Sequence, residues 1–423
     1  MKQYEIRDPV YGFVSFNDWE KNIIGHPVFQ RLRRIKQLAL TEMVYPGAVH
    51  TRFEHSLGVM HLATKMYDSI IEKDRGLLKD RLSYNQAGLK KDRQLIRLAA
   101  LLHDVGHAPF SHTSEEIMPV NAKRGKPFKH EDYTISIIKN ILKNIIEDHP
   151  INRTNYRIEA EEVAALIEGN PEVLGERLFW KVLISSQLDA DRGDYLLRDS
   201  YHTGVKYGIY DHSRLINTLA LGIEPESGEV VLGVDRDGWH VAEAVVIARY
   251  QLFTQVYFHK TRRAFDYHLK SAMGHILNGG KFPGPDLTSL EQFIGLDDYA
   301  LWNRFRGKSD DPDCSAIMSR SHIREVYSTP EVPNQEDEAE LQAKKRSLEN
   351  AGIEYYEDRS EKLWYNLNNS KNGDKEIMIV SRRERSPRPL SYYSNIVKNI
   401  GDVKQIRIYV KPGDRLRAEE VLR

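Results

Sequence analysis

The chain has 423 residues, of which 40% are hydrophobic, so it has ample material for globular burial and favours a large main domain with a smaller companion. Lysine and arginine together number 61, as do aspartate and glutamate, so the molecule has no net positive field with which to bind nucleic acid nonspecifically. Nucleic acid is therefore not indicated as a partner by net charge, and any polyanion must be met locally.

A short hairpin followed by helices is the pattern of the N-terminal part. Alternation over 4–16, with Asp8-Pro9 and Gly12 in its turn, predicts the hairpin. The charged and weakly periodic stretch 74–93 is predicted to be a surface excursion. Apolar residues elsewhere recur with a helical period, which predicts helices over 27–40, 53–71, 94–103, 131–146, 160–168, 178–200 and 240–270.

The helical pattern of the sequence ends near residue 278. Residues 278–285 include three glycines and two prolines, which predicts a boundary between a helical domain, 1–278, and a C-terminal lobe, 279–423. In the lobe, 330–345 is predicted to be a poorly ordered loop that runs into a helix. Strands are predicted at 376–381 and 405–410. The expected fold class is mainly α, a helical core with a short N-terminal β-hairpin and a small α+β C-terminal lobe.

The sequence shows neither a targeting segment nor a membrane segment. The first 16 residues lack the basic head and apolar middle of a signal peptide, and no run approaches the roughly 18 apolar residues of a membrane span. Cys314 is the single cysteine, which excludes an internal disulfide framework and fits a reducing compartment. We therefore expect a soluble cytoplasmic protein without a membrane partner, in which Cys314 is incidental.

The densest group of chemically active side chains begins where an apolar helical run ends. His103 and Asp104 end the run, and His107, His112 and His130 follow. A single histidine in an apolar helix is usually a satisfied core or surface group, but five imidazole and carboxylate groups close together favour a metal or catalytic cluster. Mixed nitrogen and oxygen ligands without thiolate suit zinc, iron, manganese or magnesium, so the sequence leaves the metal open.

His55 lies near the start of a second amphipathic helix, one turn before Val59. Read alone, it would be a capping or packing histidine. Arg52, one turn earlier, would ordinarily be a surface cation. Beside a metal cluster, however, its guanidinium is well placed to bind phosphate oxygens in a bidentate manner.

A third segment presents Asp191, Tyr195 and Asp199 at i, i+4 and i+8 of a predicted helix. This stripe of two carboxylates and a phenol would line a pocket. The alternative is a solvated helix face that carries an ordinary i,i+4 ion pair between Asp194 and Arg198.

Three segments far apart in the sequence thus carry groups that ligate divalent metal. Asp189 and Asp191, two apart on a helix, cannot point the same way, so one would ligate while the other orients a histidine. Among apolar neighbours, where the local dielectric is low and solvent is restricted, a cation acts on a substrate with little screening. The sequence therefore predicts metal-assisted hydrolysis.

These motifs, in this order, resemble the HD-domain phosphohydrolase superfamily. The resemblance is to its deoxynucleoside triphosphate (dNTP) triphosphohydrolase branch, which includes the animal SAM-and-HD-domain enzyme and bacterial relatives. It covers roughly residues 4 to 270. The stretches that carry it include Phe29-Gln30-Arg31-Leu32-Arg33, Pro46-Gly47-Ala48, Arg52-Phe53-Glu54-His55-Ser56-Leu57-Gly58-Val59 and Leu101-Leu102-His103-Asp104-Val105-Gly106-His107.

Residue by residue, the resemblance implies three sets of functional side chains. The metal ligands would be His55, His103, Asp104 and Asp191. The catalytic set would be His107, His112 and His130 around the α-phosphate, with His112 protonating the departing 5′-oxygen and Asp189 orienting it. The substrate set would be Arg52, Arg192, Tyr195 and Arg249 on phosphates, Gln37 and Asp199 on the sugar 3′-hydroxyl, and Leu38 and Tyr257 crowding the 2′ position.

Two positions depart from the family pattern. Gly25 stands where the animal enzyme has a carboxylate that reads guanine in its activator pocket, so activation by a guanine nucleotide at that place is not expected. Phe253 aligns with a histidine near the substrate, so the nucleotide would be held somewhat differently.

The resemblance implies a hydrolase that converts a dNTP and water to the deoxynucleoside and triphosphate. It also implies a homo-oligomer, a tetramer, with allosteric regulation by an activating nucleotide. The metal cluster alone does not fix the reaction, so an HD-type nucleotide phosphatase or phosphodiesterase is the alternative enzyme. A non-catalytic scaffold that binds nucleotide or single-stranded nucleic acid, with structural ions, is the third hypothesis.

Overall fold

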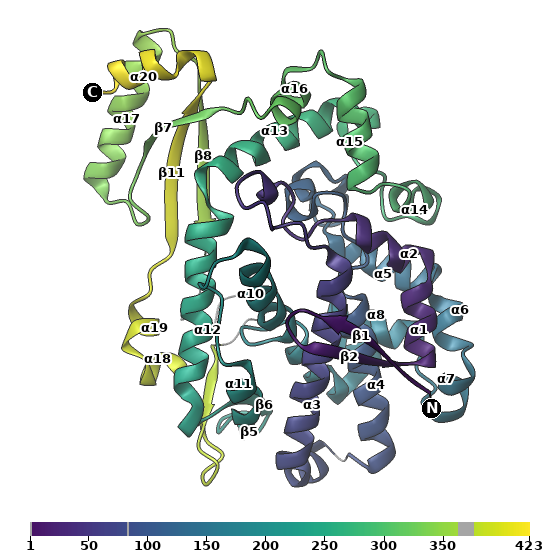
Figure 1. Cartoon of the computed structure of the whole chain (residues 1–423). Coiled ribbons are helices and arrows are strands. Elements are labelled where there is room, and N and C mark those ends of the chain that lie inside the picture. The colour runs from purple at the N-terminus through teal and green to yellow at the C-terminus, as the bar shows by residue number, and fades with distance from the viewer. Residues whose placement is uncertain (1, 83, 363–375) are drawn as a thin grey trace.

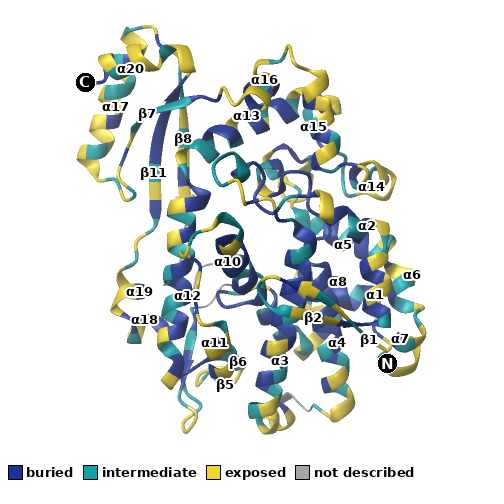
Figure 2. Cartoon of the chain, in the orientation of Figure 1, coloured by how far each residue is buried: buried dark blue, intermediate teal, exposed yellow. Residues whose placement is uncertain are grey.

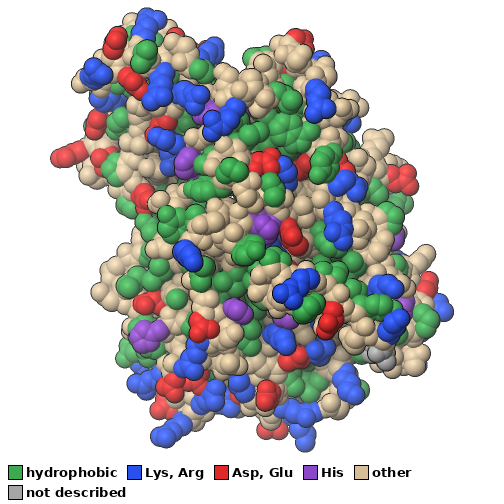
Figure 3. Space-filling view, viewed as in Figure 1, with side chains coloured by type: hydrophobic (Ala, Val, Ile, Leu, Met, Phe, Trp, Pro, Cys, Tyr) green, Lys and Arg blue, Asp and Glu red, His purple; other side chains and the backbone are tan. Residues whose placement is uncertain are grey.

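The computed structural model describes residues 2–82, 84–362 and 376–423, and their fold is mainly α-helical (Figure 1). The predicted N-terminal hairpin is confirmed as β1 (Gln3–Asp8) and β2 (Gly12–Asn17), paired antiparallel. The Asp8 carboxylate closes the turn by accepting hydrogen bonds from the amides of Val10 and Tyr11, each at 2.9 Å. On the face shown in Figure 3, positive and negative side chains are interspersed, as their equal numbers suggest.

The helical core is built around α3, which packs against both α4 and α10. In the segment of chain just before α5, β3 (Val120–Asn121) and β4 (Lys126–Pro127) pair as a small antiparallel ribbon. The helices of this part are α1 (Asp18–Gly25), α2 (Pro27–Gln30), α3 (Arg52–Leu82), α4 (Gln86–Leu102), α5 (His130–Asn140), α6 (Lys143–Glu147), α7 (Pro150–Asn155), α8 (Ala160–Glu168), α9 (Pro171–Leu174) and α10 (Ala190–Thr203).

The stretch predicted as a surface excursion, 74–93, is mostly helical, because α3 and α4 both extend into it, and most of its described side chains are exposed or half-buried. Asp74 marks a kink in α3 and is buried. Its carboxylate accepts a hydrogen bond from the amide of Leu221 at 2.9 Å and pairs with Arg385. Tertiary bonds to the charged side chain therefore hold this segment against the core.

Two predicted helices are broken by local capping and tertiary contacts. The helix predicted over 27–40 ends early, because the chain tightens into a 3₁₀ turn, η1 (Arg31–Arg34), and then becomes extended at Ile35. The helix predicted over 178–200 is split into a 3₁₀ segment, η4 (Gly175–Leu183), and α10. Asp189 starts α10 anew, because its side chain accepts a hydrogen bond from the amide of Arg192.

The next part of the chain adds helices and a four-stranded sheet in the order β10-β9-β6-β5. The helix predicted over 240–270 is interrupted by a π-turn, η6 (Phe253–Tyr257). The elements are α11 (His212–Thr218), β5 (Leu219–Ile223), β6 (Val230–Asp235), α12 (Trp239–Leu252), α13 (Lys260–Ile276), α14 (Leu287–Ile294), α15 (Asp298–Gly307) and α16 (Pro312–Ser319). Cys314, at the start of α16, is buried with a free thiol.

The small C-terminal α+β lobe is confirmed, with an antiparallel sheet in the order β7-β11-β8 and a separate apolar core (Figure 2). The predicted boundary at residue 278 stays a prediction, since β9, α18 and later segments return to the main core. The remaining elements are β7 (Arg324–Ser328), α17 (Gln335–Asn350), β8 (Tyr355–Lys362), β9 (Met378–Val380), β10 (Pro387–Pro389), α18 (Leu390–Tyr393), α19 (Asn395–Asn399), β11 (Val403–Val410) and α20 (Arg415–Val421). Among the described residues, no helix combines the length and apolar character needed to cross a membrane.

Candidate metal centre and adjoining cavity

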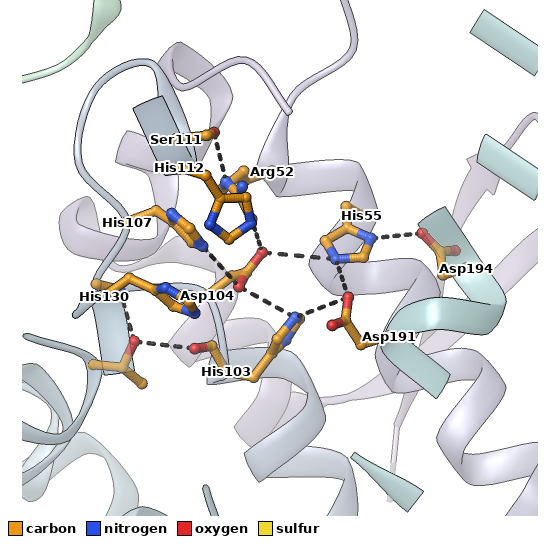
Figure 4. A network of polar contacts seen from close by, with 12 residues as sticks. Arg52, His55, His103, Asp104, His107, Ser111, His112, His130, Asp191 and Asp194 are labelled. Atoms are coloured by element: carbon orange, nitrogen blue, oxygen red, sulfur yellow. Dashed lines mark hydrogen bonds and ion pairs between the residues drawn. The ribbon is translucent and has the colours of Figure 1, made fainter. Parts of the chain in front are cut away.

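The four predicted metal ligands converge at one point of the helical core (Figure 4). His55 lies in the first turn of α3, and Asp191 lies in the first turn of α10. His103 is the C-cap of α4, and Asp104 follows it directly. Because α4 ends here, these two neighbours present their side chains to the same place.

The distances between these side chains suit a single ion. His55 Nε2 lies 3.0 Å from Asp191 Oδ1 and 3.6 Å from Asp104 Oδ2. His103 Nε2 lies 3.3 Å from Asp104 Oδ1 and 3.8 Å from Asp191 Oδ1. Ligands that share one ion through bonds of about 2.0–2.2 Å are separated by about 3 to 4 Å.

The two imidazoles are oriented for ligation by bonds at their far nitrogens. His55 Nδ1 is 2.8 Å from a carboxylate oxygen of Asp194, and His103 Nδ1 is 2.8 Å from the carbonyl oxygen of Ala100. These partners hold a ring proton on each Nδ1 and direct each Nε2 at Asp104 and Asp191, where a bound cation would take the place of an Nε2 proton. In the described structure both Nε2 atoms are buried without a hydrogen-bond partner, so the donor set fits a divalent cation.

The electrostatic balance of the site favours positive charge between these groups. Burial opposes charge on His55, but the Asp191 and Asp194 carboxylates outweigh it and raise its pKa to about 10. Burial likewise opposes charge on Asp104, but Arg52 and the neighbouring histidines hold the pKa of that carboxyl well below its ordinary value. Asp104 is therefore ionised and available as a ligand at neutral pH.

Sequence patterns alone did not assign Asp194 a functional place. The alternative interpretation of this segment placed Asp194 in a surface ion pair with Arg198, and it does bond Arg198 at 2.8 Å. Both side chains are fully buried, however, and Arg198 also bonds Asp8 of the hairpin at 2.8 Å. Burial by itself would raise the pKa of Asp194, but the charges of Arg198 and His55 outweigh burial and lower this pKa to about 2. A charged network thus connects the N-terminal hairpin to His55.

A second histidine group lies beside the metal ligands. His107 stacks on His130 with ring centroids 3.9 Å apart, and His112 lies 5.0 Å from His107. Glu115, which the sequence analysis missed, joins them. One of its carboxylate oxygens lies 2.7 Å from His130 Nδ1 and 3.1 Å from His112 Nδ1. An acidic residue three positions after His112 was the available signal.

The histidines of this group differ in their preference for protons. Burial, with Arg52 and His130 beside it, holds the pKa of His107 well below its ordinary value. Burial also opposes charge on His130, but Glu115 and Glu131 raise its pKa. An imidazole with a lowered pKa therefore stacks against one with a raised pKa, which is an arrangement suited to proton transfer.

Asp189 is the N-cap of α10. Its two carboxylate oxygens accept hydrogen bonds from the amides of Ser186 and Arg192, each at 2.7 Å. Burial raises its pKa to about 6. In the described part of the chain no contact joins Asp189 to His112, whose carboxylate partner is Glu115. The orienting role of Asp189 stays a prediction.

A cavity of about 680 Å³ lies beside the metal ligands; Arg52 borders both, and His112 connects the cavity to the histidine group. Arg52 pairs with Asp104 and donates a hydrogen bond from Nε to the Ser111 hydroxyl at 2.8 Å. The cavity lining includes every residue predicted to bind substrate, namely Gln37, Leu38, Arg52, Arg192, Tyr195, Asp199, Arg249 and Tyr257. Phe253, one of the two departures from the family pattern, also lines it, whereas Gly25 ends α1.

Asp199 is held on two sides at the cavity wall. His50 Nε2 lies 2.8 Å from one carboxylate oxygen, and the Tyr257 hydroxyl donates to the other. His50, which sequence reasoning also missed, is buried and stacks on His202 with centroids 4.4 Å apart. Asp199 therefore presents an immobilised acceptor to a bound molecule.

Comparisons with known proteins agree with this geometry. A family model described as the HD domain matches residues 52–198, and one described as an HD associated region matches residues 210–408. YwfO, an uncharacterized protein of Bacillus subtilis, is 32% identical over 357 residues, which are 78% of this chain and 72% of YwfO. A deoxynucleoside triphosphate triphosphohydrolase SAMHD1 homolog of Dictyostelium discoideum is 27% identical over 331 residues, which are 77% of this chain and 55% of that relative. The chain thus spans about half the length of that relative.

Solved structures resemble the whole chain. A hypothetical protein from Aquifex aeolicus superposes with a TM-score of 0.78 at 31% identity, covering 100% of both chains. A phosphohydrolase from Bacteroides thetaiotaomicron superposes with a TM-score of 0.71 at 25% identity, covering 97% of this chain and 100% of the other.

Proposed function

The chain belongs to the HD-domain family, and from this premise we propose that it is a metal-dependent hydrolase that converts a dNTP and water to the deoxynucleoside and triphosphate. The HD domain and the phosphohydrolase among its structural neighbours support a hydrolase. Relatives named deoxynucleoside triphosphate triphosphohydrolase support the substrate class.

One observation carries the proposal. His55, His103 and Asp104 are buried, the half-buried Asp191 joins them, and Arg52 connects this group to a cavity lined by all the residues expected to bind a dNTP. Two of its imidazole nitrogens are buried without a hydrogen-bond partner in the described structure, which a purely structural polar cluster does not require.

In this proposal, these four side chains hold the metal. Its identity stays open between manganese, magnesium, iron and zinc, because imidazole and carboxylate ligands suit all four. When bound, a divalent cation supplies Lewis acidity at the α-phosphate and lowers the pKa of a water in contact with it from about 15.7 towards about 7.

The chain's own residues would then handle the proton and the phosphate charge. We assign His112 as the general acid that protonates the departing 5′-oxygen, because it borders the cavity and its Nδ1 is held by Glu115. His107 and His130 lie beside it and would face the α-phosphate. Arg52, which joins the metal group to the cavity, would neutralise phosphate oxygens with Arg192 and Arg249.

The sugar would be selected at the opposite wall. Asp199, a fixed acceptor, would accept a hydrogen bond from the 3′-hydroxyl, and the amide nitrogen of the buried Gln37 would donate one to the oxygen of that hydroxyl. Leu38 and Tyr257 would leave no room or partner for a 2′-hydroxyl, which would disfavour ribonucleotides.

The test is product analysis. The purified chain, loaded separately with each candidate metal, is incubated with the four dNTPs singly and mixed, and the phosphorus products are separated by chromatography. We expect deoxynucleoside and intact triphosphate. Orthophosphate or diphosphate as the first product would instead indicate a phosphatase-type activity. Turnover that appears only in mixtures would support an activating nucleotide, and the molar mass in solution would test the expected tetramer.

His112→Ala is the matched control for this assay. We expect it to lose turnover while keeping wild-type metal content, because His112 acts on the leaving group and is outside the ligand set. Triphosphate release by the purified variant at the wild-type rate would refute its assigned role.

A further inference from the structure

We propose that Asp298 is a positioning residue that holds two walls of the active site in register from outside the segment that matches the HD domain. It lies at the start of α15, within the HD associated region, and its side chain is buried. This inference rests on the proposed function and names a further residue on which that site depends.

The Asp298 carboxylate bonds two separate backbone segments. Oδ2 accepts a hydrogen bond from the amide of Lys36 at 2.9 Å, and Oδ1 accepts one from the amide of Phe110 at 2.8 Å. Lys36 immediately precedes Gln37 and Leu38 of the sugar wall. Phe110 lies two residues before His112. One side chain thus connects the sugar-binding segment to the proposed general acid.

Ser111 closes these contacts into a ring. Its hydroxyl donates to the carbonyl oxygen of Lys36 at 2.7 Å, so the same Lys36 residue is held through its amide by Asp298 and through its carbonyl by Ser111. The Ser111 oxygen also accepts from Arg52, which pairs with Asp104 (Figure 4). The ring therefore extends from α15 to a proposed metal ligand.

The turn that Asp298 holds has a backbone conformation that needs external support. Phe110 and Ser111 have φ values of 60° and 56°, in the left-handed region that residues other than glycine rarely adopt. Such strain persists where surrounding contacts over-determine it, and it concentrates at functional sites. The amide of Phe110 would have to find another acceptor if the Asp298 carboxylate were lost.

Arg31 reinforces the same junction from the other side. Its Nε donates to the carbonyl oxygen of Leu296 at 2.8 Å, and its Nη1 donates to that of His107 at 2.8 Å. Arg31 thereby connects Leu296, two residues before Asp298, to the histidine group and to the 3₁₀ turn before Lys36 and Gln37. Arg31 and Asp298 thus connect the start of α15 to the segments around Lys36 and Phe110 through separate hydrogen bonds.

A carboxylate suits this place better than an amide does. Both backbone partners are N–H donors, so each oxygen of Asp298 must accept, whereas asparagine offers one acceptor and places its own N–H group against the other donor. The charged groups that act on Asp298 are Arg31 and Lys36, yet burial outweighs them and raises its pKa to about 7. The acceptor pair is therefore complete above about pH 7, and protonation removes one acceptor below it.

The test compares Asp298→Asn with Asp297→Asn. Asp297 is the adjacent N-cap of α15, and asparagine caps a helix equally well, so this control keeps the junction. In Asp298→Asn we expect at least a tenfold fall in kcat for dNTP hydrolysis, because a displacement of about 1 Å can cost about 100-fold. Metal content should match the wild type in both variants, which separates positioning from unfolding.

Two further readouts make the result specific. The wild-type to Asp298→Asn ratio of kcat should be largest above pH 7 and shrink as the pH falls, because wild-type Asp298 then also gains a proton. Amide hydrogen exchange at Lys36 and Phe110 should speed up at least tenfold in Asp298→Asn and stay unchanged in Asp297→Asn. Unchanged exchange at both amides in Asp298→Asn would overturn the inference.

The exchange measurement needs no turnover, so it decides the positioning role even if the wild-type chain releases no triphosphate and the proposed function fails. Should Asp298→Asn not fold, Ser111→Ala opens the same ring at Lys36. We then expect faster exchange in the 110–112 turn with metal content retained, and exchange at the wild-type rate there would equally contradict the proposal.

Discussion

Gly58→Ala is a sharp test of the network that orients His55. Gly58 lies on α3, where it faces α10 at close range. A Cβ at this position would lie 2.7 Å from Asp194 Cγ, and closer still to Asp194 Oδ1 and the Arg198 guanidinium. Both of those side chains are fully buried, so neither can move into solvent. Asp194 would therefore shift away from His55 Nδ1, which it now meets at 2.8 Å.

Two effects of opposite sign set the size of the change. Replacing glycine by alanine inside a helix stabilises it by about 1 kcal/mol. Forcing an extra methyl into a packed interior costs about 1–3 kcal/mol, and disturbing a buried ion pair adds to this. We expect the free energy of unfolding of Gly58→Ala to fall by about 1–2 kcal/mol net. Loss of an orienting partner should also weaken metal binding by about 10–100-fold.

Gly76→Ala on the same helix is the matched control, because a Cβ there would have no neighbour within 4 Å. It should be neutral or stabilising by up to about 1 kcal/mol, with metal affinity unchanged. Urea unfolding and competitive metal titration measure the two quantities. If Gly58→Ala bound metal as tightly as Gly76→Ala, the orienting role assigned to Asp194 would be refuted.

Other substitutions probe the remaining parts of the account. Glu115→Gln should lower kcat by about 100-fold at unchanged metal content, since it weakens the hold on His112 and His130; a wild-type rate would remove Glu115 from the proton-transfer group. Nucleotides that lack the 3′-hydroxyl should be poorer substrates for the wild type by about 10–100-fold, and Asp199→Ala should abolish that difference; persistence of the difference would place recognition elsewhere. The Glu20 carboxylate pairs with Arg97 at 2.6 Å. Burial opposes the charge of Glu20, but Arg97 outweighs burial and lowers the pKa of Glu20. The ion pair therefore stabilises the fold above about pH 4.5, and this stabilisation is lost as the pH falls through the lowered pKa. Glu20→Gln should therefore destabilise the fold by about 3 kcal/mol at pH 7 and by progressively less in acid, as unfolding curves across pH would reveal; a pH-independent difference would contradict this.

The residues predicted as metal ligands could be picked out from the sequence because the signals that mark them are local, and their ligand role stays a prediction. His103 and Asp104 end an apolar helix, and His55 and Asp191 lie in first turns of helices, so each could be recognised within its own segment. The hairpin and the C-terminal lobe could likewise be predicted from alternating apolar and polar residues and from turn residues.

The rest depends on contacts between distant segments. Glu115 and Asp298 resemble ordinary acidic residues until the fold brings His130 to one and the amides of Lys36 and Phe110 to the other. The same reason explains the broken helix after Gln30. Arg31 turns inward to bond carbonyl oxygens at Leu296 and His107, which no periodicity in the 27–40 segment encodes.

The most direct test of the central claim is the anomalous diffraction of crystals of the chain loaded with manganese or zinc. The account predicts a peak between the Nε2 atoms of His55 and His103 and the carboxylates of Asp104 and Asp191, at about 2.0–2.2 Å from the ligand atoms. A further group that could hold an ion, His275 with Asp311 and Asp313, lies elsewhere in the fold. Peaks confined to that group, with the four-residue site empty at saturating metal, would contradict the account.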